Sequence, residues 1–92
     1  AEHARRMGER FKDGLLHERI VEVRGTGLML AVDLGDADRV QTVVHDCLAH
    51  GVLGFWFLSC PTAFRIAPPL TISEAEVEHA IHVILSALGR TA

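Results

Sequence analysis

FRIAPPLTIS, residues 64–73, predicts the end of a strand, a break and the start of a helix. Pro68 and Pro69 lack the backbone N–H that a central strand needs, so the strand must stop there or lie at a sheet edge. Ser73 and Glu76 then form a capping box, in which each side chain accepts a hydrogen bond from the other residue's backbone N–H. The stretch therefore predicts a short strand followed directly by a capped helix.

Arg65 is the one charged residue in this predicted strand, and two interpretations of it stay open. Its guanidinium remains charged in proteins and presents a planar fork that suits a carboxylate. An arginine on the exposed face of an alternating strand is the more ordinary interpretation, and local chemistry alone favours it. The residues around Arg65 do not decide between these two roles.

Hydrophobic periodicity predicts the other elements. Helices are expected over residues 2–16, over 37–50 after an Asp36 N-cap, and after Ser73 as far as Gly89; strands are expected over 20–24, 28–34, 52–58 and 63–67. Gly8 inside the first helix predicts close packing at that point, because glycine otherwise weakens a helix by about 1 kcal/mol. The order α-β-β-α-β-β-α indicates an α+β fold of two layers, with a mainly antiparallel sheet of three or four strands and helices on one face.

Composition limits the class of protein. The chain has 92 residues, 49% of them hydrophobic, and a net charge of −3. This indicates one small domain or a piece of a larger one, and the uncapped helix at the start favours a piece. No basic stripe predicts nucleic-acid binding, and the apolar run 51–58 is too short to span a membrane. Two cysteines, Cys47 and Cys60, fit unbridged thiols in a reducing cytoplasm.

A complete active site is not predicted. His79 and His82 lie one turn apart on the last helix, but no other ligand is suitably spaced, so surface histidines are a better interpretation than a metal site. Lys12 is the only lysine, and its neighbours give no sign of a desolvated pocket. Cys47 falls on an apolar helical stripe and is expected to be a core thiol.

Two motifs of this chain, taken in the order in which they occur, resemble those of a known family. VRGTGLML at residues 23–30 and FRIAPPL at residues 64–70 resemble the C-terminal segment of class III aminotransferases. This family of pyridoxal-phosphate enzymes includes the ornithine, acetylornithine, lysine-ε and 4-aminobutyrate aminotransferases. The resemblance covers nearly the whole chain. It implies that residues 1–92 form the small C-terminal domain of a fold type I enzyme.

The resemblance also implies site residues. Arg65 matches the family arginine that binds the substrate α-carboxylate, and Arg24 and Gly25 are expected at the lip of the cleft. The family's cofactor lysine and phosphate contacts lie upstream in the large domain, so Lys12 is not given that role. No catalytic residue is expected in this part of the protein, which alone should bind no pyridoxal phosphate.

For the parent enzyme, the resemblance implies transfer of an amino group between an amino acid and a 2-oxo acid. A cytoplasmic homodimer, with neither nucleic-acid nor membrane partners, is expected. Residues 51–62 match the family least, so the substrate stays undetermined, and the family also holds decarboxylases and aminomutases. The alternative from another class is a free-standing α+β module for binding or oligomerisation, without catalysis.

Overall fold

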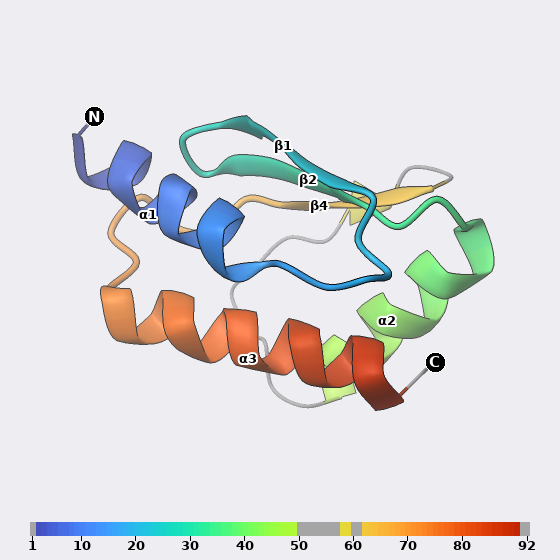
Figure 1. Ribbon diagram of the computed structural model, residues 1–92. Coiled ribbons are helices and arrows are strands. Elements are labelled where there is room, and N and C mark those ends of the chain that lie inside the picture. The colour runs from blue at the N-terminus through green and yellow to red at the C-terminus, as the bar shows by residue number, and fades with distance from the viewer. Residues whose placement is uncertain (1, 50–57, 60–61, 91–92) are drawn as a thin grey trace.

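The chain folds into a sheet with helices packed against one side of it (Figure 1), as the computed structural model shows for residues 2–49, 58–59 and 62–90. The elements in order are α1 (Glu2–Gly14), β1 (Glu22–Thr26), β2 (Met29–Asp33), α2 (Ala37–Ala49), β3 (Leu58–Ser59), β4 (Ala63–Ile66) and α3 (Glu74–Arg90). This order and the two layers confirm the predicted α+β class.

The sheet has the strand order β1-β2-β4-β3, and each of these neighbouring pairs is antiparallel. β1 and β2 form the hairpin expected from the glycine-rich turn, and β2 lies between β1 and β4. The register pairs Arg24 with Ala31 and Ala31 with Arg65. β4, the strand that carries Arg65, pairs with β2 on one side and with β3 on the other.

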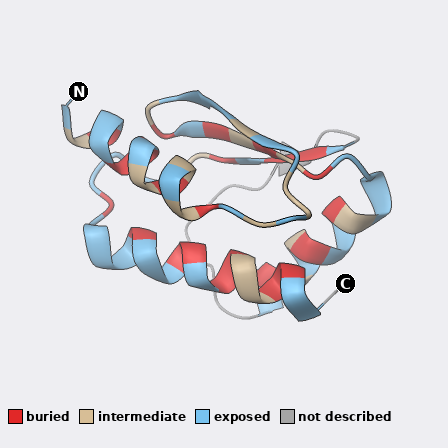
Figure 2. Cartoon of the chain, viewed as in Figure 1, coloured by how far each residue is buried: buried red, intermediate tan, exposed pale blue. Residues whose placement is uncertain are grey.

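The core lies between the sheet and the helices (Figure 2). Leu30 and Val32 on β2 and Phe64 and Ile66 on β4 are at most 2% exposed. Because successive strand residues point to opposite faces, these side chains define the inner face of the sheet. The largest helical side chains fully buried against them are those of Met7, Phe11, Val40, Val43, Ile84 and Leu88.

Both predicted helix starts are confirmed by their hydrogen bonds. Asp36 Oδ1 accepts from the backbone N–H of Arg39 at 3.0 Å, which caps α2. Ser73 N–H donates to Glu76 Oε1 at 3.0 Å, and Glu76 N–H donates to Ser73 Oγ at 3.2 Å. The capping box thus begins α3 immediately after the loop that follows Arg65.

Several predicted boundaries were wrong by a few residues. α1 ends at Gly14, and the next turn closes with the Leu15 N–H to Phe11 carbonyl bond of 2.9 Å. β1 begins at Glu22 because a turn, with Ile20 N–H on the His17 carbonyl at 3.0 Å, precedes it.

At the other end of the chain, α3 passes through Gly89 to Arg90, whose side chain is anchored to Asp46 of α2 at 2.5 Å. β3 extends to Ser59, one residue beyond the expected strand, and β4 ends at Ile66, one residue before the expected end. The expected strand over 52–57, together with Cys60, lies outside the described residues. In the described part of the chain, no helix is both long and apolar enough to cross a bilayer.

Candidate functional site

The two arginines singled out from the sequence lie in one row across the sheet. Arg24 on β1 is directly opposite Ala31 on β2, which is directly opposite Arg65 on β4. Directly paired residues of an antiparallel sheet point to the same face. Since the neighbours of Arg65 in β4 are buried under the helices, the whole row belongs to the other side, here called the outer face. The small side chain of Ala31 is all that separates the two arginines along the row.

Arg24 is held by two carboxylates on this face. One of its terminal nitrogens lies 3.0 Å from Asp33 Oδ2 and 3.2 Å from Glu22 Oε1. These contacts raise the pKa of Arg24 above its ordinary value, and the contact with Asp33 contributes most. Arg24 is thus an ion-paired cation at the edge of the sheet.

Asp33 is itself fixed by the turn that follows β2. Its Oδ1 accepts from the backbone N–H of Gly35 at 2.9 Å, and this bond, followed by the one from Arg24, lowers the pKa of the carboxyl. Backbone hydrogen bonds next to Asp33 connect the end of β2 with the residues that precede β1 and β4. Val21 N–H donates to the Asp33 carbonyl, and Leu34 N–H donates to the Thr62 carbonyl, both at 2.8 Å. Asp33 therefore connects the ion pair to the point where β4 begins.

Arg65 has a different environment. Its side chain is exposed, and among the described residues its guanidinium has no hydrogen-bond or ion-pair partner. β4 ends one residue later at Ile66, and a turn with Ile72 N–H on the Pro69 carbonyl at 3.0 Å leads to α3. The arrangement leaves a charged fork at the end of a strand, where a carboxylate can approach it.

The turn beside Arg24 depends on two close backbone approaches. Gly25 has φ of 136°, and a Cβ there would lie 2.0 Å from the Met29 carbonyl oxygen. A Cβ at Gly8 on α1 would lie 1.9 Å from the Gly27 carbonyl oxygen, which confirms the close packing predicted for Gly8. Gly25 pairs with Leu30, so its position in the ladder belongs to the inner face.

Lys12 does not lie with the arginines. It extends from α1, on the helix side of the sheet, and its Nζ donates to the Gly25 carbonyl at 2.7 Å. A cofactor such as pyridoxal phosphate needs a lysine that can form a Schiff base, together with a site for its phosphate. The one lysine is occupied in a structural hydrogen bond and is separated from Arg65 by the sheet. The described residues therefore do not fit a site for that cofactor.

The other candidate groups are dispersed. His79 and His82 are exposed on α3, and in the described part of the chain no three histidine, cysteine, aspartate or glutamate side chains gather as metal ligands would. Cys47 is fully buried, and burial raises its pKa to about 11, which confirms the predicted core thiol. A thiol with that pKa stays protonated and is a poor nucleophile at neutral pH.

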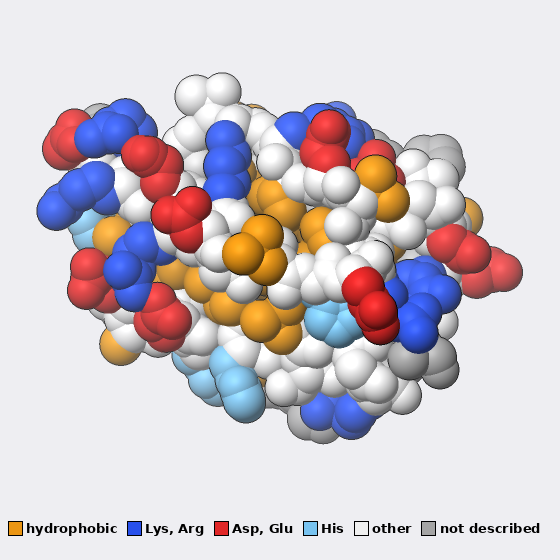
Figure 3. Space-filling view, in the orientation of Figure 1, with side chains coloured by type: hydrophobic (Ala, Val, Ile, Leu, Met, Phe, Trp, Pro, Cys, Tyr) orange, Lys and Arg blue, Asp and Glu red, His pale blue; other side chains and the backbone are white. Residues whose placement is uncertain are grey.

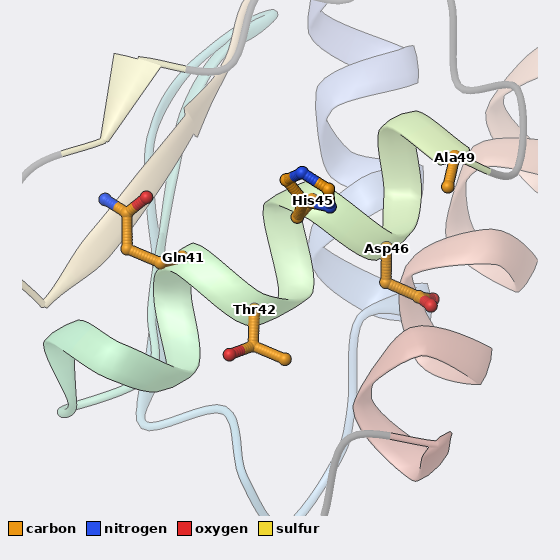
Figure 4. A pocket seen from close by; sticks show the side chains of 5 residues that line it. All are labelled: Gln41, Thr42, His45, Asp46 and Ala49. Atoms are coloured by element: carbon orange, nitrogen blue, oxygen red, sulfur yellow. The ribbon is translucent and has the colours of Figure 1, made fainter.

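Two hollows are lined by residues of the described part of the chain. One follows α2 and is lined by Gln41, Thr42, His45, Asp46 and Ala49 (Figure 4). The other lies between the end of α1 and β1, and Lys12, Leu16 and Val21 are among its lining residues. Figure 3 shows hydrophobic side chains gathered at the centre of the face viewed there, with acidic and basic groups around them. Neither hollow includes Arg24 or Arg65.

Sequence reasoning missed the ion pairs that occupy Arg24. The signal was present, because a two-residue turn at 27–28 sets the register of the hairpin. That register pairs Glu22 with Asp33 and leaves Arg24 one position diagonally from Asp33 on the same face. Counting back from the turn would have identified both carboxylates.

The chain is similar to known proteins over nearly its whole length. The family model described as aminotransferase class-III matches residues 1–88. The chain is 32% identical to an acetylornithine aminotransferase of Haemophilus ducreyi over 85 residues and 38% identical to that of Archaeoglobus fulgidus over 85 residues. These matches cover 91% and 92% of the chain but 21% of each relative. The chain thus spans about a fifth of the length of the curated relatives it matches.

Solved structures show the same fold. The lysine aminotransferase of M. tuberculosis, in its internal aldimine form, superimposes with a TM-score of 0.85 at 26% identity. That match covers 99% of this chain and 22% of the lysine aminotransferase. Sequence and fold therefore agree over nearly the whole of the chain. It belongs to the class III aminotransferase family.

Proposed function

We propose that this chain is the C-terminal domain of a pyridoxal-phosphate-dependent aminotransferase and that Arg65 binds the substrate carboxylate. The observation that carries the proposal is the contrast along one cross-strand row, where, among the described residues, Arg24 has ion-pair partners and Arg65 has none. An unpaired guanidinium at the end of a strand is suited to a bidentate bond with a carboxylate. Such a bond fixes the orientation of the substrate relative to the reacting groups.

The outer face then forms one wall of the substrate cleft. Arg24 and Gly25 lie at its rim, and Arg24 does not contact the substrate because Glu22 and Asp33 already occupy it. Pyridoxal phosphate, when bound, supplies the electron sink for amino transfer. The part of the chain described here contributes substrate binding and leaves cofactor binding to the rest of the parent enzyme. The inactivity of this chain alone is part of the same proposal.

Amino transfer is preferred over the family's other reactions because the relatives reported above are aminotransferases. A homodimeric parent in the cytoplasm, acting on amino acids and 2-oxo acids, belongs to the proposal as well. Family membership also supports this function over a free-standing binding or oligomerisation module. The amino donor stays open, since residues 50–57 and 60–61 lie outside the described part.

The test is Arg65→Met in the full-length enzyme, with paired amino donors that do or do not carry an α-carboxylate. Loss of a charge-assisted hydrogen-bonded pair costs about 2–4 kcal/mol. We therefore expect kcat/KM for the α-carboxylate donors to fall about 30-fold to 1000-fold. Donors without that carboxylate should change by less than about threefold.

The matched control is Arg6→Met, which removes an exposed arginine from the helix side. It should leave both donor classes unchanged. An Arg65→Met enzyme that keeps its kcat/KM for α-carboxylate donors would overturn the role given to Arg65. An equal loss for both classes would overturn it as well, because the defect would not then depend on the carboxylate.

A further inference from the structure

Among the described residues, the outer face carries two guanidinium groups within reach of one ligand, and one of the two is already occupied by carboxylates. Neighbouring strands lie about 4.8 Å apart, so Arg24 and Arg65, two strands apart in one row, have backbones about 10 Å apart. Arginine side chains are long enough to converge across that distance on the two ends of a small dicarboxylate. The row would therefore form a two-anion site if both arginines were free.

Arg24 is kept from binding a ligand by two carboxylates in fixed positions. Glu22 is two residues away on the same strand, and Asp33 is the diagonal neighbour across the β1–β2 pair, so both side chains belong to the same face as Arg24. Asp33 is held in place by Gly35, and its side chain is only 21% exposed. A ligand carboxylate that approached Arg24 would have to displace these groups and would meet their negative charge.

We propose that Glu22 and Asp33 are specificity-determining residues, which occupy Arg24 so that the outer face binds one carboxylate and discriminates against a second. The inference rests on the proposed function, since it takes Arg65 as the anchor of the first carboxylate. The charges on the described part of the face support it: both carboxylates contact Arg24, so Arg65 is the guanidinium that has no carboxylate partner there. Arg24 then acts as a structural cation, and the two acids exclude a second anion.

The test compares amino donors of equal chain length that carry one or two carboxylates, in the full-length enzyme. Glu22→Gln with Asp33→Asn removes both negative charges while keeping the side-chain shapes and the acceptor for Gly35. We expect the dicarboxylate-to-monocarboxylate ratio of kcat/KM to rise about twofold to fivefold, as one added exposed ion pair allows. Adding Arg24→Met to this variant should return the ratio to that of the wild type.

Two results would overturn the inference: an unchanged ratio in the folded double variant, or a raised ratio that persists after Arg24→Met. Should the double variant fail to fold, Glu22→Gln alone provides the test, because that side chain is exposed and contacts Arg24. It should raise the ratio about twofold, and an unchanged ratio again overturns the inference. The Arg65→Met enzyme separates the two ideas: if it loses monocarboxylate kcat/KM while the ratio in the double variant stays unchanged, only this inference fails. If it shows no loss, the proposed function itself fails.

Discussion

Phe64 and Arg65 are consecutive residues of β4 that serve the two faces of one sheet. Phe64 is 0% exposed in the core between the sheet and the helices, whereas Arg65 is exposed on the outer face. The inner face is stabilised by the burial of apolar area, which is not directional and tolerates few polar groups. The outer face is organised by charge: Arg24 is ion-paired, and Arg65 has no partner among the residues that the structure describes. The difference indicates that stability and binding can be altered separately in this strand.

Truncation of Phe64 and truncation of Arg65 should have very different effects on the stability of the chain. Phe64→Ala in the 92-residue chain should lower the free energy of unfolding by about 3–5 kcal/mol, because it leaves a cavity in a packed core. Arg65→Ala should change it by less than about 0.5 kcal/mol. Urea denaturation followed by circular dichroism measures both changes.

A loss of that size can exceed the whole stability of a small domain. Phe64→Leu is the milder variant, and it should still destabilise the chain more than Arg65→Ala does. Similar losses for the two positions would contradict the assignment of the two residues to different faces.

The sequence predicted the inner face better than the outer one. Apolar periodicity, the Asp36 cap and the Ser73–Glu76 box are local signals, and within the described residues the elements that they predict are present, with some ends shifted by a few residues. The occupation of Arg24 depends on a contact between two strands, which is set by register rather than by neighbours in the chain. Arg65 was identified through the family resemblance, since an exposed arginine in an alternating strand has no distinctive local pattern. The predicted end of α3 was wrong because it too depends on a contact between elements: Asp46 of α2 anchors Arg90, which lies beyond Gly89.

A second prediction tests how closely the helix layer approaches the hairpin that carries Arg24. Gly8→Ala should destabilise the chain by about 1–3 kcal/mol, because the added methyl group meets the Gly27 backbone and forces a shift. The expected loss holds even though alanine favours helix over glycine by about 1 kcal/mol.

Gly89→Ala is the matched control, because nothing lies within 4 Å of a Cβ built at that position on α3. It should leave the chain as stable as before or make it up to about 1 kcal/mol more stable. Thermal or urea unfolding of the two variants side by side gives the comparison. A stabilised Gly8→Ala chain would show that α1 does not pack on the turn as described.

A small effect on stability is expected from the Asp33 carboxyl on the outer face, and it appears only at low pH. The pKa of Asp33 is lowered from its ordinary value of 3.8, first by the Gly35 N–H and then by Arg24. A depressed carboxyl pKa contributes stability that is complete above the unfolded value and is lost as the pH falls through the folded value. Wild-type stability should therefore decline below about pH 4 more steeply than that of Asp33→Asn, which has no such group to protonate.

Urea denaturation of both chains between pH 6 and about pH 2.5 measures this difference. The contributions of the other carboxyls to the pH dependence cancel, because both chains contain them. High salt separates the two contributions to the lowered pKa of Asp33. In 1 M NaCl the contribution of Arg24 should weaken, since exposed charges are screened, whereas most of the contribution of the Gly35 hydrogen bond should remain. Parallel pH profiles for the two chains would mean that Asp33 is not held in the folded state. Arg24 would then be paired with Glu22 alone of the two carboxylates, and the exclusion of a second anion from the outer face would be correspondingly weaker.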